Sequence, residues 1–417
     1  MDLDALGRNE NISWVWSGNY QVLQPSQDRL LIHLSPGGSD ATVVREFDIN
    51  TKSFIPVEKG GFYVPEAKTN IFWRTKESVF VGTRFLNEKD DGLTDSGYSR
   101  MVKLWKRGTK LSNAVLIFES RQEDNYAYGN RHEWQDSDGT EHFVDYVRVS
   151  TSFNTVDFYI VDNKTSDLIK LLIPDGVGVS FHLHSILVKL KISWTYNKGA
   201  FEVGSLLRAK LSDVVRLSKQ LSKRDSSEMA DLFHILFKPS SRTSLKQRIS
   251  TKNFVVLHVL DNLQSRLIKW KYKEPDTWTK ETEACDDSKD GSFDVINIAA
   301  VDSRHSDAAF ISASSFTKPP TLYYSDNINK IVVGKNYGIK LQKRAASFNA
   351  DGIQTEQRWV NSKDGTPIPY FLVGKDLALK SHGPRKTLLH GYGGFWLSKM
   401  PSYSAILGTA WLEKGGL

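Results

Sequence analysis

The sequence predicts a mostly β protein that is built as a β-propeller and followed by the entry to an α/β sheet. Short runs rich in Val, Ile, Phe, Tyr and Trp recur along most of the chain, and many alternate apolar with polar residues. Turn-forming residues separate many of these runs at spacings of about 8 to 15 residues, which is typical of all-β folds. Short strands that follow one another over about 300 residues are too many for a single β-sandwich. A propeller with four-stranded blades of about 40 to 50 residues each accommodates this length.

The predicted strands follow one another in chain order without a literal sequence repeat, so the number of blades is not readable from the chain. They span residues 29–34, 43–49, 78–85, 102–106, 115–119, 143–149, 156–161, 186–194, 254–260, 266–272, 295–301, 309–314 and 330–333. Two segments depart from this pattern. The apolar spacing in 206–217 fits either a short helix or a strand with a polar interruption, and 222–227 is a charged, serine-rich loop.

A change of composition near residue 345 predicts a domain boundary, with a propeller over 1–345 and a second domain over 346–417. Two strand-like runs, 355–360 and 367–373, bracket Asp364-Gly365, and Asp-Gly between such runs favours a hairpin because glycine tolerates positive φ. Residues 384–389 then predict a buried strand that leads into a glycine-rich turn.

The turn itself carries the most specific chemical signal. An apolar strand that ends in His390-Gly391-Tyr392-Gly393-Gly394-Phe395 is similar to the loop after the third strand of α/β-hydrolases, whose backbone N–H groups help to form an oxyanion hole. Glycines let the backbone turn sharply and approach a substrate closely. The alternative is a tight glycine turn packed by Tyr392 and Phe395, and the motif alone leaves both interpretations open.

Longer motifs resemble the prolyl oligopeptidase family of serine peptidases. The start of its catalytic domain is similar to residues 362–370, 390–395, 401–404 and 411–416, and the propeller of a bacterial-type branch is similar to residues 34–41, 44–48, 65–68, 96–100 and 104–109. The resemblance spans nearly the whole chain, and its motifs occur in the correct order.

The resemblance implies a role for each matching residue. Tyr392 matches the tyrosine whose hydroxyl donates to the oxyanion, within the oxyanion loop of Gly391, Gly393 and Gly394. Phe395 matches an aromatic residue that lines the pocket for the substrate proline. A seven-bladed propeller, incomplete here at its start, would cap the site and admit only short peptides. No metal and no organic cofactor is implied.

The chain departs from the family pattern at the nucleophile. A serine at a strand-to-helix elbow requires Gly-x-Ser-x-Gly, but Gly334 and Gly338 are the only glycines four apart, and Asn336 lies at their centre. The family places its serine, aspartate and histidine after the position that matches Gly416. We therefore expect a fragment, truncated at both ends, that is inactive alone and whose part after about residue 345 packs poorly by itself.

Composition excludes several other classes of protein. The single cysteine, Cys285, rules out an intrachain disulfide and favours a reducing, cytoplasmic location. No basic and apolar leader begins the sequence, and no apolar run approaches the roughly 18 residues that span a bilayer, so no membrane partner is expected. Basic residues give a net charge of +7 but are scattered among acids, and the densest group, Lys219, Lys223 and Arg224, lacks regular aromatic neighbours. No nucleic-acid partner is expected.

Three further groups of side chains are weak candidates for chemistry. His182 and His184 lie two apart on a predicted strand but lack an evident third metal ligand. Acidic neighbours raise the pKa of a thiol, which disfavours Cys285 as a nucleophile. The acids at Glu88, Asp90 and Asp91 predict a solvated turn.

The first functional hypothesis is therefore a monomeric serine endopeptidase of the prolyl oligopeptidase type, whose partners are short peptides cut after proline. The alternative is a non-catalytic β-propeller that binds a peptide or a protein. A third hypothesis, a basic nucleic-acid binder, predicts affinity that falls steeply with salt.

Overall fold

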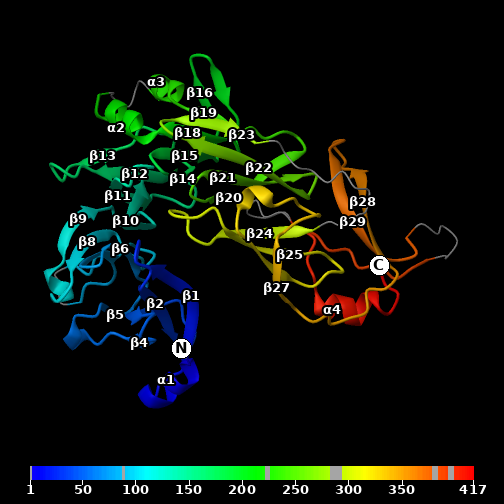
Figure 1. Cartoon of the computed structure of the whole chain (residues 1–417), viewed down its shortest axis with the longest axis horizontal. Helices are drawn as coiled ribbons and strands as arrows, with labels where there is room; N and C mark the ends of the chain where they lie inside the picture. Colours follow the sequence, from blue (N-terminus) through cyan, green and yellow to red (C-terminus); the bar gives the residue numbers. More distant parts are fainter. Residues whose placement is uncertain (1, 87–89, 221–225, 282–293, 378–383, 393–398) are drawn as a thin grey trace. The chain divides into compact units, whose positions relative to one another are not determined.

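The computed structural model describes residues 2–86, 90–220, 226–281, 294–377, 384–392 and 399–417. Contacts divide the chain into two compact units, Met1–Ile235 and Leu236–Leu417. In the described residues, six antiparallel sheets of four or five strands follow one another along the sequence (Figure 1). In five of these sheets four consecutive strands are neighbours, and in the fourth sheet a small hairpin is inserted between the second and third strands; this is the order of propeller blades. The predicted mostly β, propeller-like character is confirmed.

The first unit contains four of these sheets. Helix α1 (Leu3–Glu10) precedes the first sheet, which comprises β1 (Trp14–Val22), β2 (Arg29–Pro36), β3 (Thr42–Asp48) and β4 (Ser53–Phe54), with β5 (Tyr63–Ala67) also paired to β3. The second comprises β6 (Asn70–Thr75), β7 (Ser78–Gly82), β8 (Met101–Lys106) and β9 (Val115–Glu119). The third comprises β10 (Tyr126–Gln135), β11 (Glu141–Ser150), β12 (Val156–Val161) and β13 (Leu168–Lys170).

The fourth sheet carries the insertions of the first unit. It comprises β14 (Val177–His182), β15 (Ser185–Leu190), β18 (Leu206–Lys210) and β19 (His234–Phe237), the last of which crosses the boundary between the units. A small hairpin, β16 (Trp194–Tyr196) with β17 (Gly199–Phe201), and helices α2 (Leu211–Gln220) and α3 (Ser226–Asp231) are inserted between its strands.

The second unit contains two further sheets and a hairpin. The fifth sheet comprises β20 (Thr243–Ser250), β21 (Phe254–Asp261), β22 (Gln264–Lys273) and β23 (Thr277–Lys280). The sixth comprises β24 (Val295–Ala300), β25 (Ala309–Ser314), β26 (Thr321–Ser325) and β27 (Ile339–Lys343). The hairpin of β28 (Ile353–Asn361) and β29 (Pro367–Lys375) precedes α4 (Ala405–Leu407), which continues into the π-helical turn η6 (Gly408–Leu412).

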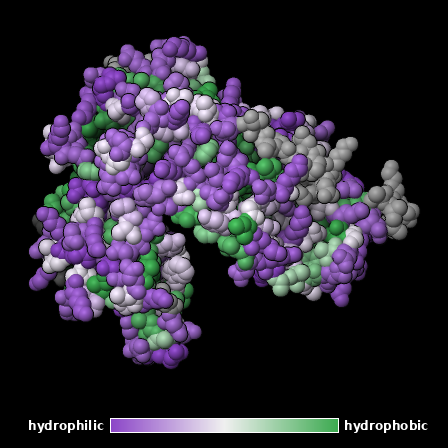
Figure 2. Space-filling model, viewed as in Figure 1, coloured by the Kyte–Doolittle hydropathy of each residue, from purple (hydrophilic) through white to green (hydrophobic). Residues whose placement is uncertain are grey.

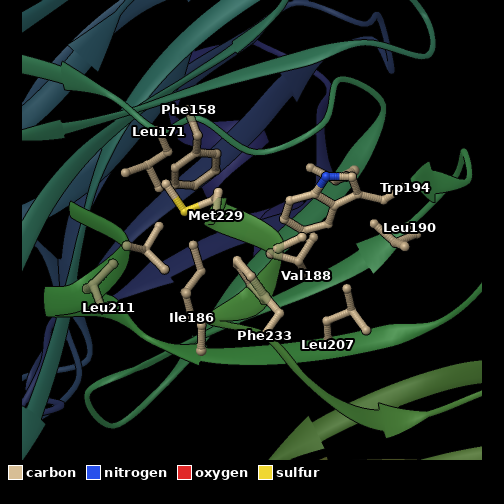
Figure 3. Packing of buried hydrophobic residues seen from close by; sticks show 14 of the residues in the cluster. Phe158, Leu171, Ile186, Val188, Leu190, Trp194, Leu207, Leu211, Met229 and Phe233 are labelled. Atoms are coloured by element: carbon tan, nitrogen blue, oxygen red, sulfur yellow. The ribbon is translucent and has the colours of Figure 1, made fainter. Parts of the chain in front are cut away.

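Each unit has its own apolar core. In the first, α2 and α3 cover the fourth sheet, and Figure 3 shows Met229, Leu211 and Phe233 pointing toward Ile186 and Val188 of β15. In the second, side chains of the fifth and sixth sheets pack together around Val256 and Ile311. On the face seen in Figure 2, hydrophilic residues predominate and hydrophobic ones are interspersed. Full burial of such aliphatic side chains contributes about 1.5–3 kcal/mol each.

A buried carboxylate fastens the first two sheets together. Glu46 of β3 is fully buried. Its carboxylate accepts hydrogen bonds from two guanidinium nitrogens of Arg107, at 2.8 and 3.0 Å, and from the backbone N–H of Phe62 at 3.0 Å. Because Arg107 follows β8 of the second sheet, this bidentate pair fixes the position of one sheet relative to the next.

Three local predictions are resolved by the structure. The ambiguous segment 206–217 is a strand, β18, that continues directly into helix α2. The strand predicted over 330–333 is wrong, because the 3-10 turn Ile328–Lys330 is followed only by a bridge between Val332 and Asn336. The Asp364-Gly365 hairpin is confirmed, and Gly365 has the positive φ of +85° that favoured it.

The strand predicted over 384–389 is also not formed as expected. Beyond β29 the described residues contain no assigned strand, and Leu388 and Leu389 are exposed and not buried. No described helix or strand covers Leu388 and Leu389 sufficiently to bury their side chains. Among the described residues, no helix is long and apolar enough to cross a membrane.

Candidate functional site

The predicted oxyanion loop lies at the end of the second unit, and the structure describes its first half. Tyr392 is 48% exposed, and the ammonium nitrogen of Lys399 lies 5.5 Å from the centre of its ring. Gly391 is exposed, and a Cβ added there would meet nothing within 4 Å. Gly393, Gly394 and Phe395 lie outside the described residues. The assignment of Tyr392 and the three glycines to an oxyanion site, and of Phe395 to the pocket for the substrate proline, therefore stays a prediction.

Backbone pairing holds the segment before this loop. The N–H of Leu388 donates to the carbonyl of Leu417 at 2.9 Å, and the N–H of Leu417 donates to the carbonyl of Lys386 at 2.9 Å. Leu417 therefore forms hydrogen bonds with the residues on both sides of Thr387. This is the hydrogen-bond pattern of a parallel bridge. In addition, Arg385 donates to the carbonyl of Lys375 at the end of β29, at 2.8 Å.

The helix between the two paired segments packs on residues 347–349, which follow the predicted domain boundary. The rings of Phe348 and Tyr403 are stacked 5.0 Å apart, and the Tyr403 hydroxyl accepts the N–H of Ser347 at 2.7 Å. Gly408 lets the helix approach the linker, because a Cβ there would collide with the Phe348 ring. Glu413 accepts the N–H of Asn349 at 2.6 Å.

This arrangement supplies hydrogen-bond donors at an accessible loop. A phenol hydroxyl and adjacent backbone N–H groups are the donors that stabilise the oxygen of a tetrahedral intermediate. Leu417 is thus paired with the segment 386–388, and α4 with η6 lies between these two paired segments in the sequence.

The weaker candidates do not assemble into a metal site. His182 ends β14 and His184 lies in the turn that follows, so they do not share one side of a strand as predicted. No group of three or more potential ligands that could hold a metal occurs among the described residues. Cys285 and Glu88 lie outside the described residues.

The acidic turn and the basic cluster are largely explained by local pairing. Asp90 accepts the N–H of Gly92 at 2.8 Å and pairs with Arg100, as expected of a solvated turn. Lys219 pairs with Asp162 at 2.6 Å, while Lys223 and Arg224 lie outside the described residues. A surface pair of this kind explains Lys219 without a nucleic-acid partner.

Sequence reasoning missed a polar and aromatic cluster on the third sheet. Tyr128 of β10 lies directly opposite Arg148 of β11, and Tyr126 lies on the same face of the sheet two residues earlier. The Arg148 guanidinium donates to the Tyr126 hydroxyl at 2.8 Å. The Tyr-x-Tyr spacing was a possible signal, because residues two apart on a strand share a face.

Comparisons with known proteins agree with this architecture. Residues 2–330 match the family model described as the prolyl oligopeptidase N-terminal beta-propeller domain. An uncharacterized peptidase of Sinorhizobium fredii is 33% identical over 430 residues, covering 100% of this chain and 53% of the relative. A prolyl endopeptidase of Elizabethkingia miricola is 32% identical over 108 residues, which cover 26% of this chain and 14% of that protein. The chain spans about half the length of the first curated relatives it matches.

Solved structures show the same fold at lower identity. A post-proline cleaving enzyme from Rickettsia typhi superposes with a TM-score of 0.81 at 24% identity, covering 100% of this chain and 57% of that one. Prolyl oligopeptidase B from Galerina marginata, bound to a 35mer hydrolysis and macrocyclization substrate, superposes with a TM-score of 0.66 at 17% identity. That match covers 99% of this chain and 53% of the other.

Proposed function

The chain belongs to the prolyl oligopeptidase family of serine peptidases, and we propose that the whole protein is an endopeptidase that hydrolyses short peptides on the carboxyl side of proline. The family resemblance inferred from the motifs is thereby confirmed. The substrate class, the seven-bladed propeller and the assignment of 346–417 to the opening of an α/β-hydrolase domain belong to the proposal.

The observation that carries the proposal is the parallel hydrogen-bond pairing of 386–388 with Leu417. The two backbone hydrogen bonds between 386–388 and Leu417 enclose a helix and the His-Gly-x-Gly-Gly motif. A strand, a glycine-rich loop, a helix and a parallel return are the order expected where an α/β-hydrolase sheet begins. Added strands from the remaining half of the protein would cover 384–389, which explains why this apolar segment is exposed here.

The proposed chemistry is acyl transfer to a serine. The serine hydroxyl would attack the carbonyl carbon of the proline residue while a histidine takes its proton, and an aspartate would orient that histidine. Tyr392 would donate its hydroxyl to the oxyanion, next to a backbone N–H beside the serine. Collapse would release the amine with the proton from histidine, and water would then hydrolyse the ester. We assign the serine, histidine and aspartate to sequence outside these 417 residues.

The test uses the whole protein and the substitution Tyr392→Phe, which removes only a hydroxyl. With a chromogenic peptide that carries proline before the scissile bond, we expect kcat to fall about 100-fold and KM to change by less than about twofold, because the donor acts mainly on the transition state. The control is Tyr63→Phe, an exposed tyrosine of β5.

Cleavage by Tyr392→Phe at the unchanged rate would remove Tyr392 from the oxyanion site. Absence of any cleavage by the whole protein, with retained peptide binding, would favour the non-catalytic binding module instead. Short peptides as the partners, a monomeric state, a cytoplasmic location and independence of cofactors stay predictions. Sedimentation, cell fractionation and assay in the presence of chelator would test the last three.

A further inference from the structure

The guanidinium of Arg148 in β11 contacts the side chains of two tyrosines. Its guanidinium donates to the Tyr126 hydroxyl at 2.8 Å, and its central carbon lies 5.5 Å from the Tyr126 ring and 5.6 Å from the Tyr128 ring. These distances are within the range of cation–π attraction. Both tyrosines come from β10, the edge strand of the third sheet, and Arg148 is only partly buried.

A second arginine in the same hairpin shows the usual solution for a buried cation. Arg131 of β10 forms a bidentate pair with Asp145 of β11, at 2.6 and 2.8 Å, and Arg74 of β6 donates to the same carboxylate at 2.9 Å. Arg131 and Asp145 lie on the opposite face of the β10–β11 hairpin from Arg148, because successive residues of a strand alternate.

No such carboxylate accompanies Arg148. Within the described residues of Met1–Ile235, no Asp or Glu oxygen lies within 4.0 Å of its guanidinium. An arginine stays charged in any protein environment and carries five N–H donors, and the two tyrosine hydroxyls do not use all of them. A partly buried cation with unused donors favours a negatively charged ligand.

The surrounding groups add donors and positive charge. A phenol that accepts from Arg148 through its oxygen still has its own O–H to donate. Burial raises the pKa of Tyr128, so the Tyr128 hydroxyl keeps its proton at neutral pH. Toward solvent, Tyr98 lies 6.2 Å from Tyr126 and is 39% exposed, and the Lys68 ammonium lies 4.4 Å above the Tyr98 ring.

We propose that Arg148, Tyr126 and Tyr128 form a carboxylate-binding site that takes the free C-terminal carboxylate of a short peptide. A planar guanidinium fork matches a planar carboxylate, and the flanking rings give an apolar surface for the residue that bears it. The choice of a peptide rests on the proposed function. Phosphate shares the anionic chemistry and serves as a competing ligand in the test.

Binding is measured by calorimetry on the 417-residue chain with a tetrapeptide that lacks proline. The peptide is used once as the free acid and once as its C-terminal amide. We expect the free acid to bind about tenfold or more tightly than the amide, since charge-assisted hydrogen bonds differ from neutral ones by about that factor. Because the peptide has no proline, this readout is independent of the proposed cleavage.

Four variants separate the site from general effects. Arg148→Gln should abolish the preference for the free acid, and Tyr126→Phe should reduce it while keeping the ring. Arg148→Lys keeps the charge but loses the fork, so an intermediate preference is expected if the glutamine variant does not fold. The matched control is Arg216→Gln on α2, which removes one exposed positive charge and should change nothing.

Three outcomes would overturn the proposal. Equal affinity for acid and amide would exclude carboxylate recognition, and a preference that survives in Arg148→Gln would place it elsewhere. Inorganic phosphate that displaces the peptide at far lower concentration than acetate would reassign the site to phosphate. None of these results bears on cleavage after proline by the whole protein, which the Tyr392→Phe experiment tests separately.

Discussion

At the scale of single residues, buried ionisable side chains make the stability of this chain depend on pH. His258 of β21 is 1% exposed, and desolvation lowers its pKa from 6.5 to about 4. Its Nε2 lies 3.0 Å from the Ser265 hydroxyl. The imidazole is therefore neutral in the folded protein at neutral pH. The unfolded chain takes up the proton first as the pH falls, which favours unfolding.

From this we expect an acid-sensitive contribution that is fully present above pH 6.5 and lost as the pH falls toward about 4. Its upper size is about 3 kcal/mol, since each pKa unit corresponds to about 1.4 kcal/mol. Urea unfolding at pH 7 and pH 4 should show that the native chain loses more free energy of unfolding than His258→Gln does. His305→Gln, at an exposed histidine, is the control. Parallel losses in the native chain and His258→Gln would contradict the argument.

At the scale of elements, the strands that sequence reasoning identified are mainly the inner ones of each sheet. β21 is an example, because all eight of its residues are buried and six of them are apolar. The first strands β1, β6, β10, β14 and β20 were not predicted. They are edge strands, and irregular pairing in β1, β6 and β20 interrupts the alternation on which the prediction depends.

The helix near the C-terminal end illustrates a contact that residue type alone did not reveal. Gly408 begins η6, where intrinsic propensity would favour alanine by about 1 kcal/mol. A Cβ at this position would, however, collide with the ring of Phe348, which is stacked on Tyr403. Packing and propensity thus predict opposite signs for the same substitution.

We expect Gly408→Ala to destabilise the packing of this helix by about 1–3 kcal/mol, because overpacking forces the ring or the backbone to move. Hydrogen exchange of residues 403–413 measures the effect locally. Gly391→Ala is a suitable comparison, since its Cβ would meet nothing within 4 Å. Slower exchange in Gly408→Ala than in the native chain would mean that helix propensity, and not the contact with Phe348, determines the stability of this element.

At the scale of the whole molecule, the chain combines six multi-stranded sheets with a C-terminal part in which an apolar segment is exposed. Leu389 is 94% exposed, although it lies in an apolar sequence, and only two backbone hydrogen bonds join 386–388 to Leu417. A parallel sheet normally buries both faces of its strands under helices. The exposure of this segment is consistent with the expectation that 346–417 packs poorly alone.

Limited proteolysis is expected to cleave the chain first between residues 376 and 404, before any site within the six sheets, because local opening there exposes little buried surface. Mass spectrometry of the early fragments identifies the order of cleavage. The comparison strand is β21, which is buried throughout. Protection around Tyr392 equal to that of β21 would show that the C-terminal part is stably packed.

The sequence by itself determined the β class, the family and the position of the glycine-rich loop. These depend on local features: alternating apolar runs, the Asp364-Gly365 turn and the His390–Phe395 motif are legible without any knowledge of distant neighbours. The exact agreement at 156–161 and 309–314 has the same origin, since both strands are paired on two sides and half of each pattern faces a core.

Only the tertiary structure decided which residues from separate strands meet. The partnership of Arg131 with Asp145, and the absence of such a partner for Arg148 among the described residues of its unit, follow from the β10–β11 register and not from sequence spacing. The exposure of residues 384–389 could likewise not be predicted from their composition. Burial of an apolar strand depends on what the rest of the molecule places over it, and hydrophobicity alone does not specify that layer.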